Sequence, residues 1–581
     1  MSQNNIESKD IFDKKFNLIE KIDNTSNINN ERNNSNKDFN NERCKMKLFL
    51  RKKKMNEKIF NKRKKEAHSL LYPRIHREKF IMLNESFINL ISKIQTEYKD
   101  EKKLLILLNK ISYIIEQKYN DKNTEIVHEI FNFTTDDLIN NNWAYNLCNL
   151  SKIYFKSPNV IEFISRIFLN SCLLINNDLE NEETNILYDE KETLNRSAYF
   201  ISSDRYIDVY NKILSLYLNE NFTISVNMIN FIGQIAKNEK SNQLSLYVGG
   251  TMKLILDSIN TEKTEDKLLK EKIWCLSKFE VEKLYETNLE LVLKIQNIYI
   301  DIYQNKEKYE LFNDINEEVD DNNFLYNYLK LIENSVGCIE NIVVENLIKS
   351  NLIEFLIDNF INKDIEFNNI IIKILINLSN SESNLCKRLI NIGVIKYLKN
   401  IIKDKTLPVI IREIAFYPIN NFIYDLQLCN LVMFEQKVFQ LSYDILSNDE
   451  DLEPLIFKEI LTGFDELVIK NQNSILSQLI NKYKIIQLIC KRMKKIMNLK
   501  IYLEVLDKFC NFFIALMDNN DNDLINQIII IFQNSEGEEI LDKILIFVSK
   551  ISSDEIDKED ANLISNITAM SEIIKDKIKD I

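Results

Sequence analysis

The sequence predicts an all-α protein built as a solenoid of stacked helices, and three observations support this fold class. From about residue 77 to 550, apolar residues recur at spacings of three and four in blocks of 10 to 15 residues, as in amphipathic helices. No strand-like alternation of comparable length interrupts them. The 581 residues include only 7 Gly and 5 Pro, too few for folds with many tight turns or Gly-rich nucleotide loops. Since a single core stops growing near about 250–300 residues, we expect a repeat array.

Composition divides the chain into four parts. Residues 1–42 are polar and are expected to be a disordered tail. Residues 43–70 contain a basic segment, in which positions 43–65 carry 12 Lys/Arg against one acid, Glu57. Removing that segment from the formal net charge of -12 leaves 63 basic and 86 acidic residues. The predicted helical repeats, about nine or ten units, span 77–550, and residues 551–581 are expected to be an acidic C-terminal extension or cap.

The repeat period is read from two similar segments, 374–402 and 417–446, each with an Asn near a helix end. Their alignment places Asn377 opposite Asn420, a step of 43 residues. An earlier copy at 338–361 places Asn341 in the same role, with a shorter connector. Armadillo and HEAT repeats have periods of about 40–47 residues, so we expect a right-handed superhelical armadillo solenoid.

Enzymatic, metal-dependent and membrane-inserted classes are not expected. No phosphate-binding loop, nucleophile elbow or zinc-protease motif is present, and the three His residues do not lie near a candidate nucleophile. No cofactor is expected. The nine Cys occur singly in apolar surroundings, as reduced core thiols do. No run approaches the roughly 18 apolar residues of a membrane span, and the acidic balance argues against direct nucleic-acid binding.

The basic segment resembles the importin-β-binding segment of importin-α (karyopherin-α) proteins. The chain carries spaced basic residues, then Leu50-Arg51-Lys52-Lys53-Lys54 with Glu57, in the order and spacing of the family's core. A second similarity is REIAFYPINN at 412–421. The resemblance implies an importin-β contact through Arg43, Lys45, Lys47, Arg51, Lys52, Lys53, Lys54 and Lys58.

The resemblance also implies a cargo-binding groove. In importin-α proteins the third helix of each repeat presents a Trp and, four residues later, an Asn, which together hold an extended basic localisation signal. Here the early positions depart from this pattern, and the third unit offers either Tyr188 or Tyr199. The later Asn residues are expected to lie in register. The predicted groove residues are Trp143, Asn146, Gln234, Trp274, Asn341, Asn377, Glu413, Phe416 and Asn420.

The resemblance further implies partners and regulation. The cluster Lys62, Arg63, Lys64 and Lys65 is similar to a localisation signal, so it is expected to fold back into the groove and compete with cargo. The implied function is a nuclear import adaptor that shuttles between cytoplasm and nucleus, links cargo to importin-β and meets a nuclear export factor. The alternative is a signalling or cytoskeletal armadillo scaffold whose basic segment is only its own localisation signal.

Overall fold

The computed structural model describes residues 87–579, with gaps at 121–137, 139–141, 183–199, 201–203, 239, 260–267, 281–287, 310–322, 338–339, 361–363, 449–451, 471–473, 498–501, 519–520 and 552–557. Every regular element in these ranges is a helix. The described residues all fall in one unit of the chain, Leu83–Val319 with Asn323–Ile581.

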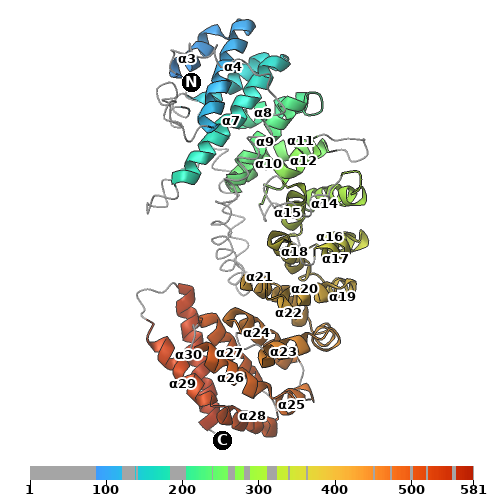
Figure 1. The fold of residues 1–581 in the computed structure, drawn as a ribbon, viewed down its shortest axis with the longest axis vertical. Helices are drawn as coiled ribbons and strands as arrows, with labels where there is room; N and C mark the ends of the chain where they lie inside the picture. The colour runs from blue at the N-terminus through green and yellow to red at the C-terminus, as the bar shows by residue number, and fades with distance from the viewer. Residues whose placement is uncertain are drawn as a thin grey trace, which may run out of the picture. The chain divides into compact units, whose positions relative to one another are not determined.

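Among the described residues, ten helices form a ladder in which each packs against the next along the chain (Figure 1). We call them the ladder helices. In chain order they are α4 (Glu101–Asn120), α7 (Pro158–Glu182), α9 (Phe222–Asn238), α12 (Leu269–Leu276), α15 (Phe324–Ser335), α18 (Ile365–Leu378), α22 (Phe416–Tyr424), α24 (Pro454–Lys470), α27 (Leu503–Met517) and α30 (Lys558–Lys579).

Other helices precede each ladder helix and complete a repeat unit. The helices directly before a ladder helix are α3 (Phe87–Glu97), α6 (Trp143–Tyr154), α8 (Asp204–Tyr217), α11 (Thr251–Asp257), α14 (Leu289–Gln304), α17 (Leu352–Asn359), α20 (Val394–Lys403), α23 (Val438–Asn448), α26 (Ile485–Met497) and α29 (Gly537–Ser549). In the described part of the chain, six units add a first helix: α10 (Lys240–Val248), α16 (Asn341–Lys349), α19 (Ser383–Ile392), the π-helix η6 (Leu431–Glu435), α25 (Ser474–Asn481) and α28 (Asn522–Asn534).

A left-handed residue marks the turn between the first and second helix in all six of these units. Only Gly populates positive φ without strain, and other residues lose about 1–2 kcal/mol there. The positive φ nevertheless recurs although the residue type varies, so the sharp turn is a structural feature of the repeat unit. The residues are Gly250, Asn351, Gly393, Lys437, Lys484 and Glu536.

The ladder helix of the unit that contains REIAFYPINN is broken in two. A short helix, α21 (Val409–Ile414), ends immediately before α22. Pro418 has no N–H to donate to the carbonyl of Ile414, and its ring crowds that carbonyl. The break at Ala415 is therefore a consequence of Pro418, and both halves pack against α18 and α24.

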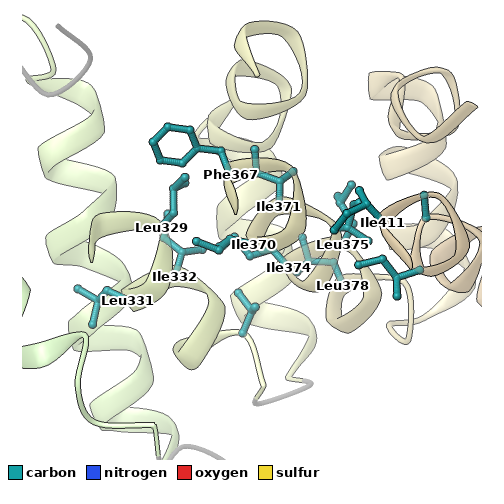
Figure 2. Packing of buried hydrophobic residues seen from close by; sticks show 14 of the residues in the cluster. Leu329, Leu331, Ile332, Phe367, Ile370, Ile371, Ile374, Leu375, Leu378 and Ile411 are labelled. Atoms are coloured by element: carbon teal, nitrogen blue, oxygen red, sulfur yellow. The ribbon is translucent and has the colours of Figure 1, made fainter. Parts of the chain in front are cut away.

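Apolar residues of successive ladder helices form the core. Figure 2 shows buried residues of α15, α18 and α21 in one continuous row, including Ile332, Ile370 and Ile411. Each such side chain contributes about 1.5–3 kcal/mol by leaving water. Because this row occupies the packed sides of a ladder helix, the polar residues collect on its remaining face.

The prediction of core thiols is confirmed for the seven cysteines that the described residues contain, which are buried and form no disulfide. Burial raises the pKa of Cys148, Cys490 and Cys510 to about 12. These thiols therefore stay protonated and are poor nucleophiles.

One expectation about the chain needs correction. Residues 158–175 of α7 are long and apolar enough for a membrane span by composition, although 56% of this window is buried inside the fold between α4 and α9.

Helix α30 packs against α27 and α29 and reaches Lys579. It lies within residues 551–581, the segment expected to be a C-terminal extension or cap.

Candidate functional site

Within the described residues, one face of the ladder helices is not packed against another helix and carries a row of polar residues. Each inner ladder helix packs against a ladder neighbour on either side, and its buried apolar residues join the common core. On the uncovered side, half-buried residues recur at spacings of three and four, as one helix face requires. We call this row the ladder stripe: Asn227, Asn230, Glu271, Tyr326, Lys330, Glu333, Asn334, Glu366, Lys373, Asn377, Tyr417, Asn421, Thr462, Asp465, Glu504, Asp507, Lys508 and Asn511.

Two lysines share one carboxylate at the centre of the stripe. Lys330 Nζ lies 2.7 Å from Glu333 Oε2 on the same helix, and Lys373 Nζ, from α18, lies 3.5 Å from Glu333 Oε1. Burial opposes ionisation of Glu333, but the two ammonium groups outweigh it and hold the pKa of this carboxyl below its usual range. We call Lys330, Glu333 and Lys373 the central cluster.

Carboxylates gather beside the later part of the stripe, around Lys458, a buried residue of α24. Lys458 Nζ lies 3.1 Å from Glu413 Oε1, 3.1 Å from Glu459 Oε1 and 2.9 Å from Glu504 Oε2. Although burial disfavours its ammonium form, these carboxylates raise the pKa of Lys458. Helices α21, α24 and α27 are thereby joined through one cation.

Two further aspartates extend this acidic region. Burial, with the carboxylates Glu466 and Asp507 beside it, raises the pKa of Asp465 to about 6, against the opposing effect of Lys508. Burial likewise raises the pKa of Asp507, whose Oδ2 accepts a hydrogen bond from Asn511 Nδ2 at 3.0 Å. Lys508 carries the second positive charge of this region. We define the late acidic cluster as Glu413, Glu459, Asp465, Glu504 and Asp507.

Two oxygens in the late acidic cluster have no hydrogen-bond partner among the described residues. They are Glu413 Oε2 and Asp465 Oδ1, and both are buried. A buried acceptor without a donor costs about 1–3 kcal/mol. The cluster therefore combines excess negative charge with unused acceptor capacity.

The predicted early groove residues do not form an open slot. Trp143 begins α6, directly after Asn142 at positive φ, so it belongs to a second helix and not to the ladder. Its indole is buried and donates to Ser171 Oγ at 3.1 Å. Asn146 lies on the same second helix. The prediction that Trp143 and Asn146 face a groove is wrong.

Trp274 does lie on the ladder, but its ring is buried against the rest of the fold. A Cβ added to Gly233 would come within 2.1 Å of Trp274 Cζ3, so the indole packs directly on the α9 backbone. Lys278 Nζ lies 5.3 Å from the ring centroid on its own chain. Trp274 is 4% exposed, and Gln234, on α9, is also buried. The prediction that Trp274 and Gln234 are accessible to a ligand is therefore wrong.

The groove residues predicted in the later repeats lie only partly where they were expected. Asn377 and Asn420 lie on ladder helices, and Glu413 belongs to the late acidic cluster. Asn420 Nδ2 donates to Glu459 Oε2 at 2.9 Å, so it fixes that carboxylate instead of facing outwards. Phe416 is a core residue at 1% exposed. Asn341 begins α16, a first helix, so its predicted equivalence with Asn377 is wrong.

Sequence reasoning missed Asn334, Tyr417 and Asn421. Asn334 lies 43 residues before Asn377, the same step that separates Asn377 from Asn420, so a strict period would have found it. Asn421 Nδ2 donates to Ser379 Oγ at 2.8 Å, and Asn334 Nδ2 donates to the carbonyl of Ser277 at 3.1 Å. Each amide ties its ladder helix to the end of the preceding one.

Several predicted features fall outside the described residues. These are the importin-β-binding residues from Arg43 to Lys58, the autoinhibitory cluster from Lys62 to Lys65, and the alternatives Tyr188 and Tyr199. Within the described ranges, no group of three or more His, Cys, Asp and Glu side chains is arranged to hold a metal ion.

No family model and no curated protein matches the sequence. Among solved structures, an engineered protein from a structural-genomics programme has a TM-score of 0.55 at 10% identity, over 85% of this chain and 99% of its own. A designed armadillo repeat protein in complex with the peptide (KR)4 has a TM-score of 0.32 at 13% identity, over 43% of this chain and 95% of its own. Another designed armadillo repeat protein has a TM-score of 0.33 at 14% identity, over 46% and 98%.

The predicted all-α armadillo-repeat solenoid is confirmed as the fold class. Its own geometry supports this statement, because successive ladder helices pack against one another in chain order and the helices before each of them complete a repeat unit. The chain is therefore an armadillo-like helical-repeat scaffold.

Proposed function

We propose that this protein binds basic, extended segments of other proteins on the late part of the ladder stripe. The observation that carries the proposal is the late acidic cluster, in which five carboxylates surround two ammonium groups, Lys458 and Lys508. A guanidinium or ammonium group from a ligand would offset the excess charge. Neutral or acidic segments gain no favourable electrostatic interaction with the cluster, so charge selects the class of ligand.

The raised pKa values of Asp465 and Asp507 support the same choice of ligand. In the unliganded protein, burial disfavours the ionised form of both carboxyl groups. A bound cation favours the charged form and lowers both pKa values. Binding is therefore expected to weaken as the pH falls through about 6.

In cells, we propose that the protein acts as a nuclear import adaptor that catalyses no reaction. Its basic segment at 43–70 would bind importin-β while the ladder stripe holds a basic localisation signal. This proposal includes shuttling between cytoplasm and nucleus and recycling by an export factor. It rests on the resemblance of the basic segment and on the acidic late stripe.

Residues 40–70 fused to a fluorescent reporter test the adaptor role. Direct binding to purified importin-β is expected, with an affinity that falls as salt rises, because many Lys and Arg contacts share the interaction. If the fusion instead binds only importin-α, the segment is an ordinary localisation signal. The scaffold alternative would then replace the adaptor role.

A peptide titration tests the binding site. A labelled peptide with a Lys/Arg cluster is titrated with the full chain and followed by fluorescence anisotropy. The double variant Asp465→Asn with Asp507→Asn is expected to bind about five- to tenfold more weakly. Asp358→Asn is a matched control, since Asp358 is an exposed acid on α17. Equal affinity of the double variant and the control would refute the site.

A further inference from the structure

The charge of the ladder stripe changes along its length. The late acidic cluster lies on α21, α24 and α27, whereas the central cluster on α15 and α18 exposes lysine. Lys373 is 29% exposed in its side chain, and its one ion pair within the described residues is the 3.5 Å contact with Glu333. An ammonium group has three donors, so Lys373 retains capacity for an anionic partner.

Glu333 cannot neutralise both lysines of the central cluster. Its Oε2 already receives Lys330 at 2.7 Å, and only Oε1 remains for Lys373. Glu280, four residues after the end of α12, also acts on Lys330, which leaves Lys373 with Glu333 as its one ion-pair partner in the described part of the chain. A basic ligand residue would meet repulsion above Lys373, and an acidic one would meet attraction.

The spacing between the two clusters can be converted into residues of an extended ligand. Helix α18 packs against α22, which packs against α24, so two ladder steps separate Lys373 from Lys458. Packed helices lie about 8–10 Å apart, which gives about 16–20 Å. An extended chain rises about 3.3 Å per residue, so the span corresponds to about five or six residues.

We propose that Lys373 and Lys330 are specificity-determining residues that select ligands with an acidic side chain about five or six residues from the basic cluster. This inference rests on the proposed function, because it assumes that the basic cluster occupies the late stripe. The stripe thus recognises a bipolar segment and disfavours a continuous run of lysines. Selection depends on both the sign of the charge and its distance from the basic cluster.

Five labelled peptides of equal length test the proposal against the full chain. Each contains the same Lys/Arg cluster. Two peptides carry Glu, one six residues before the cluster and one six residues after it, and two more carry Lys at the same two places. The fifth peptide has neutral residues at both places. Because an extended ligand has one direction in the stripe, one Glu peptide is expected to bind about two- to fivefold more tightly than the neutral peptide. The Lys peptide with the same placement is expected to bind more weakly.

Charge variants assign the effect to the central cluster. Lys373→Gln is expected to abolish the preference for Glu, and Lys373→Glu to reverse it. Lys387→Glu, on the exposed face of α19, makes the same charge change away from the ladder and is expected to leave the preference intact. Circular dichroism confirms that each variant folds.

The outcomes separate the two claims. If the neutral peptide binds but neither Glu peptide gains affinity, or Lys373→Gln retains the gain, the selection by the central cluster is refuted while the proposed function stands. If no peptide binds, both are refuted.

Discussion

Gly233 and Trp274 illustrate how one contact decides what a residue can do. Sequence similarity suggests a tryptophan that holds ligand lysines, and the sequence does contain a Trp near the end of an expected third helix. In the fold, the missing side chain of Gly233 allows the indole to pack against α9, and Lys278 Nζ lies 5.3 Å from the ring centroid. The residue type was predictable, but its accessibility depended on a glycine one unit earlier.

Replacing Gly233 with Ala should therefore destabilise the protein. The new Cβ would lie 2.1 Å from Trp274 Cζ3, so the indole or α9 has to shift, at a cost of about 1–3 kcal/mol. Urea unfolding followed by tryptophan fluorescence measures the change. Gly337→Ala serves as control, since its Cβ would meet only a 3.6 Å contact. Equal stability of the two variants would show that the indole does not pack on Gly233.

Asp465 makes the protein's stability depend on pH. Its folded pKa, about 6, lies above the ordinary value of 3.8, so the folded state holds the proton more tightly. The contribution of Asp465 to stability is therefore present below the unfolded pKa and is lost as pH rises through about 6. Asp465→Asn should raise the melting temperature at pH 7.5 but not at pH 4, as measured by scanning calorimetry. A variant less stable than the parent at pH 7.5 would contradict this account.

The turn between first and second helices is the best-defined element of the repeat. Its positive φ recurs from Gly250 to Glu536, on residues as different as Gly, Asn, Lys and Glu. Sequence alone does not identify these turns, because Lys and Glu rarely adopt this conformation. The ladder itself was predictable, since its apolar spacing and 43-residue step are explicit in the sequence.

Glycine substitutions test the turns directly. Lys437→Gly removes the strain of a side chain at φ 58°, so it is expected to stabilise the protein by about 1 kcal/mol. Gly393→Ala, at φ 109°, is expected to destabilise it by about 1–2 kcal/mol. Thermal unfolding of both variants measures the difference. The same sign of change in the two would rule out left-handed strain as the cause.

The errors at element scale have one physical origin. All the helices of a unit are amphipathic, so Trp143, which begins a second helix, and Asn341, which begins a first helix, were both predicted to be ladder residues. Connector lengths vary between units, which shifts the register by a helix. The charged residues of the late acidic cluster were missed, apart from Glu413, because their grouping depends on packing between α21, α24 and α27.

At the scale of the whole molecule, the chain joins a basic segment to a solenoid with an acidic stripe. The basic segment carries 12 Lys/Arg, and the rest of the chain holds 63 basic and 86 acidic residues. Opposite charges on one chain attract each other at high effective concentration. We therefore propose that the attraction expected for a basic ligand in trans also acts on residues 62–65 in cis.

Deleting residues 1–70 should accordingly strengthen the binding of a basic peptide. The competitor Lys62–Lys65 is removed while the described helices remain, so the affinity is expected to rise at least about tenfold. Anisotropy titrations of the deleted and full chains at equal salt measure the change. A full chain with Lys62, Arg63, Lys64 and Lys65 replaced by Ala separates loss of the cluster from loss of the segment. Equal affinities throughout would exclude autoinhibition.

The most direct test of the central claim is to locate a bound basic peptide. A Lys/Arg-cluster peptide that carries a photoreactive group is cross-linked to the full chain, and the attachment sites are identified by mass spectrometry. Cross-links should concentrate on α22, α24 and α27, around Thr462, Asp465 and Asn511, and should be competed by unlabelled peptide. Cross-links confined to α4–α12, or spread evenly over second helices, would contradict the assignment of the late stripe as the binding site.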